Sequence, residues 1–425
     1  MFKKILIIII IILAITLIGL FVWVFLVSRQ SEGEMTVRES FHEIFPFGSN
    51  NENRDFFQGQ NFGDIGADLL DRKNSEENKN DDAVIPRLRQ IADFAVAGVS
   101  VTENEEGRQL IKYIARENGH IFETFADSLT QKRISNTTIL RIQDALWFLN
   151  GNAFIARFLD ESGSEVESFY AEIKQKQITS TTTDSEGSLS GSFLPKDIID
   201  LSLSKDKNKL FYLIKSGDGS VGIVSDADGS KKVQIFNSPF SEWSAQWPYG
   251  DIIALTTKPS SNTIGYLYFL NSKNEDFKKI LFGITGLTTL VNENGTKVLF
   301  TQNRRGQIFL SVADIKNDEI IDLPIQTFSE KCVWSKIDEN IIYCGMPNTI
   351  LDEDTLDLWY QGLISFSDSM WIIDTKTQTT NILINPIDVV GKEIDIIKPI
   401  LSPDENYLFF VNKKDSTLWQ LRRSK

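Results

Sequence analysis

Cysteine, histidine and basic residues are scarce in this chain. Its 425 residues include two cysteines and two histidines, which rules out a disulfide-dense scaffold and gives no reason to expect a structural zinc site. Lys and Arg number 44 against 58 Asp and Glu, so the formal net charge is -14. Because this charge repels phosphate backbones, we expect no nucleic-acid partner. Metal binding could rest only on carboxylates, and we predict neither a metal site nor a cofactor.

One apolar run is long enough to cross a membrane. Ile5 to Val27 contains no charged residue and could span a hydrocarbon core of about 30 Å as a helix. Lys3 and Lys4 precede it, and positive charge stays on the cytoplasmic side. The sequence therefore predicts a transmembrane anchor in residues 1–30, with a cytoplasmic N-terminus and an extracytoplasmic remainder. A cleaved signal peptide is the alternative, but it usually has a shorter apolar region and a small-x-small motif, which residues 25–29 lack.

Residues 31–84 are polar and show no sustained helical or strand period. Asn, Glu, Asp, Gly and Ser dominate, most strongly in NSEENKNDD from Asn74. Such a segment cannot bury enough apolar surface to fold alone, so we predict a flexible, disordered linker. The folded domain is then expected in residues 85–425.

A faint repeat runs through this domain. In each copy a large apolar residue precedes a turn. The turns begin at Thr102, Phe148, Ser204, Pro248, Asn292, Ser335 and Ser402. Intervals between these positions are 46, 56, 44, 44, 43 and 67 residues. A four-stranded propeller blade needs about 40–45 residues, so the repeat indicates seven blades.

Each copy continues with short apolar segments typical of strands. The first segment of each is LIKYIA, FIARFL, LFYLIK, IIALTT, VLFTQN, IIYCG and LFFVNK. Short strands at even spacing predict an all-β fold, a seven-bladed β-propeller that follows the transmembrane helix and the linker. The last copy ends before its outer strand. We predict that RLRQIA, residues 87–92, supplies that strand and closes the ring.

The best-formed copies resemble a known repeat. LSPDENYLFF with VNKKDSTLWQL from Leu401, and VNENGTKVLFTQNRRGQIFLSVAD from Val291, look like the TolB-type, WD-like propeller repeat of bacterial envelope proteins. The resemblance covers the domain but not the linker, and Glu405 stands where that repeat has a turn glycine. It implies a disc that binds or scaffolds other molecules, although this fold hosts many functions.

Two insertions lengthen the repeat, and we expect both on one face of the disc. The Ser/Thr/Gly-rich ITSTTTDSEGSLSGS from Ile178 is placed between blades two and three, and a segment from Gly345 lies between two strands of blade six. The candidate binding residues of the second insertion are Asp352, Glu353, Asp354, Asp357, Trp359, Tyr360 and Phe366. Aromatic residues among polar ones suit contacts with protein, peptide or sugar. Alternatively, Trp359 and Phe366 pin the loop onto the disc, or the carboxylates bind calcium.

Two local motifs have structural interpretations. Gly217 to Gly222 matches the dinucleotide-binding fingerprint, but it joins two strands, so we interpret it as a hairpin turn. Cys332 and Cys344 flank the turn of blade six and could face each other across its strands. We predict a disulfide between them, and two small buried hydrophobic side chains are the alternative. No catalytic triad is visible, and we predict no catalytic residue.

These features predict a single-pass membrane protein whose extracytoplasmic propeller is a protein-interaction or assembly scaffold and not an enzyme. Its expected partners are the membrane, through the N-terminal helix, and another envelope protein. The alternatives are a propeller hydrolase or lyase, or a carbohydrate-binding module, that uses the loop-rich face.

Overall fold

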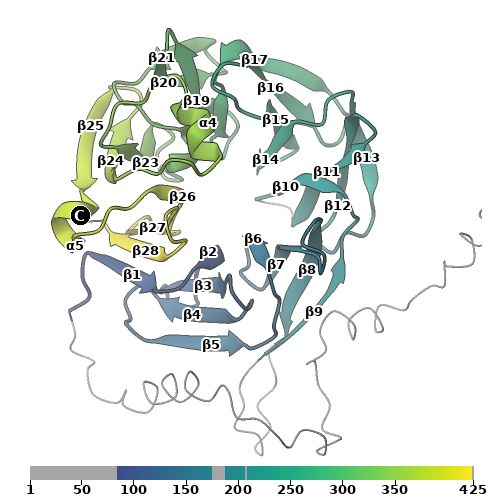
Figure 1. Cartoon of the computed structure of the whole chain (residues 1–425), viewed down its shortest axis with the longest axis vertical. Helices are drawn as coiled ribbons and strands as arrows, with labels where there is room; N and C mark the ends of the chain where they lie inside the picture. Colours follow the sequence, from purple (N-terminus) through teal and green to yellow (C-terminus); the bar gives the residue numbers. More distant parts are fainter. Residues whose placement is uncertain (1–83, 175–186, 206–207, 424–425) are drawn as a thin grey trace, which may run out of the picture. The chain divides into compact units, whose positions relative to one another are not determined.

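The computed structural model describes residues 84–174, 187–205 and 208–423. Within these ranges the strands form seven four-stranded antiparallel sheets that surround a central axis (Figure 1). The prediction of an all-β, seven-bladed propeller is therefore confirmed. The expected anchor at Ile5 to Val27 and the linker lie outside the described residues. No helix within the described ranges has the length and apolar character needed to cross a membrane.

In blades one to six, four consecutive strands form each sheet. In blades one to four the first strand lies nearest the axis (Figure 1). Blade one contains β2 (Val96–Glu103), β3 (Gln109–Ala115), β4 (Ile121–Phe125) and β5 (Gln131–Ser135). Blade two contains β6 (Ile142–Trp147), β7 (Ala153–Leu159), β8 (Val166–Lys174) and β9 (Ser188–Phe193). Blade three contains β10 (Ile198–Leu203), β11 (Lys209–Ser216), β12 (Gly219–Asp226) and β13 (Val233–Ser238). Blade four contains β14 (Trp243–Tyr249), β15 (Ile252–Thr257), β16 (Ile264–Asn271) and β17 (Phe277–Thr285).

The remaining blades carry the short helices. Blade five contains β18 (Thr288–Val291), β19 (Lys297–Arg304), β20 (Gln307–Asp314) and β21 (Glu319–Asp322). Blade six contains β22 (Cys332–Trp334), β23 (Ile341–Pro347), β24 (Asp368–Asp374) and β25 (Thr379–Ile384). Blade seven contains β26 (Ile396–Leu401), β27 (Tyr407–Asn412), β28 (Leu418–Arg422) and β1 (Leu88–Ala92). The helices among the described residues are η1 (Ser329–Lys331), α4 (Thr355–Tyr360) and α5 (Pro386–Val390).

The core lies between neighbouring blades. In β11, four consecutive side chains from Leu210 to Leu213 are fully buried. Leu210 and Tyr212 pack toward blade two, whereas Phe211 and Leu213 pack toward blade four. Side chains alternate between the faces of a strand, and both faces of an inner sheet are covered here. The segment therefore appears in the sequence as a continuous apolar run.

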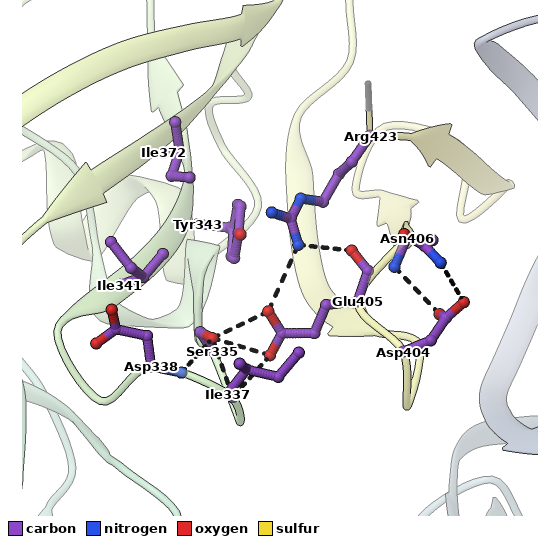
Figure 2. Close-up of a pocket in the computed structure, with 10 residues that line it drawn as sticks. All are labelled: Ser335, Ile337, Asp338, Ile341, Tyr343, Ile372, Asp404, Glu405, Asn406 and Arg423. Carbon is purple, nitrogen blue, oxygen red and sulfur yellow. Dashed lines mark hydrogen bonds and ion pairs between the residues drawn. The ribbon is translucent and has the colours of Figure 1, made fainter. Parts of the chain in front are cut away.

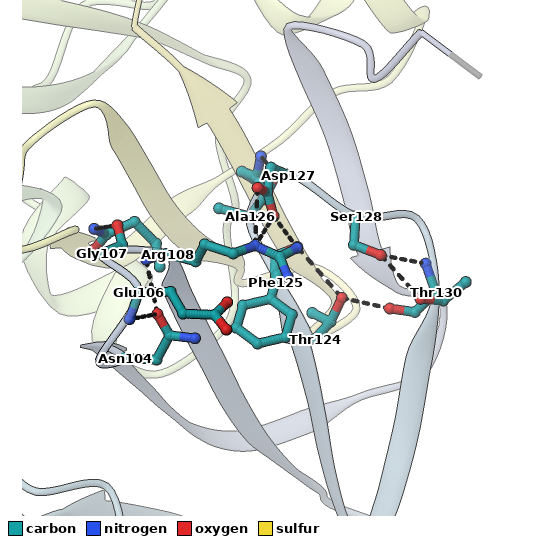
Figure 3. A network of polar contacts seen from close by, with 12 residues as sticks. Asn104, Glu106, Gly107, Arg108, Thr124, Phe125, Ala126, Asp127, Ser128 and Thr130 are labelled. Atoms are coloured by element: carbon teal, nitrogen blue, oxygen red, sulfur yellow. Dashed lines mark hydrogen bonds and ion pairs between the residues drawn. The ribbon is translucent and has the colours of Figure 1, made fainter. Parts of the chain in front are cut away.

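The closing strand lies where the sequence predicts it. β1 pairs antiparallel with β28. From this strand, the buried Arg89 donates hydrogen bonds to the carbonyl oxygens of Phe125, Ala126 and Ser128 in the β4–β5 turn of blade one. An exposed ion pair joins Arg108, in the connection between β2 and β3, to Asp127 in the same β4–β5 turn (Figure 3). Hydrogen bonding and strand pairing thus join the two ends of the domain.

The predicted position of the first insertion is wrong. Its final residues form β9, which pairs with β8 as the outer strand of blade two. Residues 175–186, which lie outside the described residues, therefore connect two strands of one blade and not two blades. Because neighbouring strands are antiparallel, this connection and the blade-six insertion belong to opposite faces of the disc. A Ser- and Gly-rich outer strand has weak strand propensity, which explains the error.

The hairpin interpretation of Gly217 to Gly222 is confirmed. Ser216 pairs with Gly219, so Gly217 and Asp218 form a two-residue turn between β11 and β12. Gly217 has a φ of 59°. Glycine favours such a turn because it adopts positive φ without steric cost.

Candidate functional site: the blade-six insertion

Residues 348–367 form an insertion between β23 and β24 and include α4. Pro347 and Asp368 are register partners, so the chain leaves and rejoins the sheet at one point. The sequence predicts this position correctly. Figure 1 shows α4 within the outline of the disc, near the labels of β19 and β23. Loops on a rigid scaffold are frequent binding sites, so the attachment of this insertion decides what it presents.

The buried side of the insertion packs onto the disc. Leu356, Trp359 and Phe366 belong to one apolar cluster with Ile308 and Phe328 of the propeller. Trp359 and Phe366 are buried, as expected if they pin the loop onto the disc. A partner cannot reach these two side chains in this structure. They therefore fix the position of α4, and contacts with a partner must come from other residues.

A sealed ionic cluster lies beneath these aromatic rings. The Lys331 ammonium forms ion pairs with Asp368 and with Asp395, and all three side chains have 0% exposure. Lys331 directly precedes β22, Asp368 begins β24 and Asp395 directly precedes β26. The sequence does not reveal this cluster, because three ordinary charged residues far apart in the chain meet only in the folded propeller.

The two carboxylates have different surroundings. Asp395 Oδ2 accepts hydrogen bonds from the Trp359 indole at 3.0 Å and the Phe366 backbone N–H at 3.0 Å. Asp368 Oδ2 accepts from the Ile396 N–H at 2.6 Å, whereas its Oδ1 is buried without a hydrogen-bond partner. Burial, more than the nearby Asp395, raises the pKa of Asp368 to about 6 despite the adjacent Lys331 ammonium. The two carboxylates thus differ in their hydrogen bonding, and no oxygen of the cluster reaches an external substrate.

Tyr360 closes the edge of the insertion. Its hydroxyl donates a hydrogen bond to Glu330 in η1. Burial raises the pKa of Glu330. Burial and the Glu330 carboxylate together raise the pKa of the Tyr360 phenol well above its usual value. A protonated phenol therefore remains the donor at neutral pH, and this contact ties α4 to the disc.

The candidate carboxylates do not converge on one point. Asp357 accepts hydrogen bonds from Ser260 Oγ and the Ser261 N–H, which lie between β15 and β16. Asp352 forms an isolated β-bridge with Gln307 of blade five. Glu353 and Asp354 are exposed. In the part of the chain that is described, no group of three His, Cys, Asp or Glu side chains could hold a metal ion.

Apolar side chains project from the outer side of the insertion. Ile350 is 84% exposed, Leu363 68% and Tyr360 43%. Beside Ile350 lies a groove of about 540 Å³ between blades five and six. The groove is lined by Phe309, Leu323, Pro324, Ile325, Gln326, Met346, Pro347, Asn348, Thr349 and Ile350. We define Ile350, Leu363, Tyr360 and this groove as the insertion surface. Exposed large apolar residues and grooves are both typical of interaction sites.

A second hollow, of about 300 Å³, lies at the other end of the strands of blades six and seven. Figure 2 shows the Glu405 carboxylate between Ser335 and Arg423 in this hollow. The carboxylate accepts from Ser335 Oγ at 2.9 Å and from the Ile337 N–H at 3.2 Å. Arg423 donates to the Glu405 carbonyl oxygen at 2.6 Å. These groups satisfy one another, so we assign the hollow a structural role.

Cys332 and Cys344 are register partners in β22 and β23, and a disulfide joins them. The bond links the first two strands of blade six, and Cys332 directly follows Lys331. It therefore stabilises the part of the disc that carries the insertion.

No protein-family model matches the chain, and no curated protein is similar to it in sequence. Among solved structures, the oligogalacturonate lyase of Vibrio parahaemolyticus matches with a TM-score of 0.53 and 9% identity, over 79% of this chain and 93% of the lyase. An oligogalacturonate lyase in complex with manganese matches with a TM-score of 0.51 and 10% identity, over 80% of this chain and 93% of that one. TolB of Acinetobacter baumannii matches with a TM-score of 0.41 and 10% identity, over 66% of this chain and 62% of TolB. The chain thus spans less than two thirds of the length of TolB, and the lyase matches establish the β-propeller fold but no activity.

Proposed function

We propose that the chain is a membrane-anchored, extracytoplasmic scaffold that binds another envelope protein through the insertion surface. The observation that carries this proposal is the contrast between the two sides of the insertion. Trp359 and Phe366 fix it to the disc, while Ile350, at the groove, and Leu363 are exposed to solvent. Exposing two large aliphatic side chains has a hydrophobic cost, and a protein partner that covers them would remove this cost.

The rest of the surface suits a protein partner. Tyr360 is half-exposed next to Leu363, and Asp352, Glu353 and Asp354 provide a charged rim. An apolar centre with a polar rim is typical of protein–protein interfaces, in which a few large side chains contribute most of the binding energy. The sealed cluster beneath α4 holds this surface in place before a partner binds, which reduces the entropy lost on binding.

Site-specific photocrosslinking in cells tests the proposal. A photoreactive residue replaces Ile350 or Leu363, and matched controls replace Leu149 or Ile337. The controls are 72% and 74% exposed and lie in the connections between the first two strands of blades two and six. These connections belong to the disc face opposite the insertion, because adjacent strands are antiparallel.

We expect one defined protein to be crosslinked from positions 350 and 363, and not from positions 149 or 337. Equal capture from all four positions would contradict a specific insertion surface. No capture from any position would instead favour the lyase, hydrolase or carbohydrate-binding hypothesis. Accessibility of a cysteine introduced at position 350 to a membrane-impermeant reagent in intact cells tests the extracytoplasmic location separately.

A further inference from the structure

We propose that Lys331 and Asp368 become joined by an intramolecular amide bond, with Asp395 as the carboxylate that transfers protons. Lys331 Nζ lies 2.7 Å from Asp368 Oδ2 and also contacts Asp395. An amine and a carboxyl group are the groups that amide formation requires, and the second carboxylate can accept and return protons. The product would covalently link the residue before β22 to the first residue of β24, beneath the insertion.

The fold holds the reacting groups together. Lys331 and Asp368 lie at the starts of β22 and β24 in blade six, and Asp395 lies at the start of β26 in the adjacent blade seven. Groups held in contact can react as if at effective concentrations of about 10⁵ M or more. A slow condensation between an amine and a carboxyl group can therefore proceed during the lifetime of the folded protein.

The different surroundings of the carboxyl groups assign their roles. Asp395 Oδ2 accepts two N–H hydrogen bonds that hold the side chain in place, while Oδ1 contacts Lys331 Nζ, so Asp395 is positioned to accept a proton from the ammonium. Asp368 is the acyl group, because burial raises its pKa to about 6 and so increases the protonated fraction. Its Oδ2 accepts from the Ile396 N–H, while Oδ1 has no hydrogen-bond partner. The N–H can stabilise negative charge on Oδ2, and Oδ1 can leave.

The surroundings also exclude water. All three charged side chains have 0% exposure, and the rings of Trp359 and Phe366 each lie 5.2 Å from Lys331 Nζ. Exclusion of bulk water strengthens electrostatic interactions and slows hydrolysis of the product. An apolar lining also favours the conversion of three buried ionisable groups into a neutral amide and a neutral acid.

The reaction balances without an oxidant or a co-reactant. The Asp395 carboxylate removes a proton from the Lys331 ammonium, and the resulting amine attacks Cγ of the protonated Asp368. A C–N bond forms, and negative charge develops on Oδ2. Asp395 returns its proton to the departing Oδ1, which leaves as water when the C–O bond breaks. The nitrogen then loses a second proton to Asp395, so the products are a neutral amide, one water molecule and a protonated Asp395.

Mass spectrometry of the full-length wild-type protein tests the proposal. After reduction and alkylation, the intact mass should be lower by one water than the mass calculated for the sequence with both cysteines alkylated. Trypsin should give one branched product, in which the peptide of residues 317–336, uncut at Lys331, is joined to the peptide of residues 337–376. Reduction is essential because the Cys332–Cys344 disulfide joins the same two peptides.

Three results would overturn the proposal. An intact mass without the loss of water shows that the cluster remains ionic. Complete tryptic cleavage after Lys331 also shows that no amide has formed at this side chain. A branch between residues 317–336 and 393–413 shows that Asp395 is the acyl group, which contradicts the assigned roles.

Two variants provide controls. Lys331→Met removes the amine and should abolish the loss of water. Asp395→Asn keeps the size and an oxygen acceptor but removes the proton-transferring carboxylate. After equal times, the fraction of this variant that has lost water should be at least tenfold smaller than that of the wild-type protein. If either variant fails to fold, the wild-type branched peptide still decides the question. A fully condensed, folded Asp395→Asn protein would show that Asp395 has no role in proton transfer.

Discussion

At the level of single residues, the least expected chemistry lies around Lys331. Its ammonium faces two buried carboxylates. The Lys413 ammonium donates to the Trp359 carbonyl oxygen at 2.7 Å and interacts electrostatically with Asp395 without forming an ion pair with it. Two negative charges against one positive charge leave the sealed cluster with excess negative charge when both carboxyl groups are ionised. Protonation of Asp368 removes this excess, so the behaviour of the cluster should depend on pH.

We predict that amide formation is faster below the pKa of Asp368 than above it. Burial raises this pKa to about 6, so Asp368 is more fully protonated, and a better acyl group, on the acidic side. Protein purified unfolded from inclusion bodies can be refolded at about pH 5 and about pH 8, and the branched peptide followed with time. We expect faster accumulation at the lower pH. A rate that rises with pH would contradict protonated Asp368 as the acyl group.

The same pKa gives a stability prediction for protein in which the amide has not formed. A folded-state pKa raised from 3.8 to about 6 means that the folded state binds a proton more tightly than the unfolded state. The free energy of unfolding should therefore increase by about 2 kcal/mol as the pH falls from 6 to 4, through this group alone. Urea denaturation of freshly refolded protein measures this slope. Protein in which the amide has formed should lack this pH dependence of stability, because Asp368 no longer titrates in it.

Glu405 is a second residue with an unexpected role. It has a φ of 54° in a turn where the resembling repeat has glycine, yet it is buried and joins blades six and seven. We predict that Glu405→Gly destabilises the protein by about 2 kcal/mol, because lost hydrogen bonds outweigh the relief of backbone strain. Glu405→Gln, which keeps an acceptor oxygen, should lose less. Both changes are measured by chemical denaturation. A more stable glycine variant would show that the turn conformation matters more than the contact between blades.

At the level of elements, close approach of the inner strands determines how the blades pack. A Cβ added to Gly98 in β2 would lie 2.0 Å from the carbonyl oxygen of Ala145 in β6. Backbone atoms cannot yield as a flexible side chain can, so only glycine fits at this contact between blades one and two. Packing density in protein interiors leaves no room for an extra methyl group at such a point.

We predict that Gly98→Ala costs about 2 kcal/mol or more of stability, because the inner strands must separate. Gly217→Ala is the matched control, since Gly217 has a φ of 59° but no atom within 4 Å of an added Cβ. It should cost only the backbone strain, about 1 kcal/mol. Thermal denaturation of both variants measures the difference. Equal losses of stability in the two variants would show that the close contact between β2 and β6 adds nothing to the cost of the Gly98→Ala substitution.

At the level of the whole molecule, stability depends on joining the ends of the domain. Sheet pairing between β1 and β28 closes blade seven, and Arg89 extends from β1 to the β4–β5 turn of blade one. The burial of Arg89 lowers its pKa, which shows that its charge is held in an unfavourable environment. Its hydrogen bonds must offset this cost, and their removal would take a donor from the carbonyl oxygens of Phe125, Ala126 and Ser128 and from the buried Gln420 side chain.

Arg89→Met should therefore destabilise the protein by about 3 kcal/mol, while Arg108→Met costs about 1 kcal/mol or less. Both arginines contact the same turn, but the Arg108–Asp127 pair is largely exposed (Figure 3). Urea denaturation with limited proteolysis near residue 96 distinguishes opening of the ring from a general loss of stability. If the two variants behave alike, closure does not depend on Arg89.

The sequence by itself determined the number of blades, the closing strand and the position of the blade-six insertion. Each follows from spacing along the chain, because strands of fixed length joined by short turns must recur at a nearly constant interval. Tertiary structure alone decided that Trp359 points into the disc, that the Ser-rich segment after residue 187 is a strand, and that Lys331 meets Asp368 and Asp395. These outcomes depend on which side chains neighbouring blades bring together, and residues separated by entire strands leave no common pattern in the sequence.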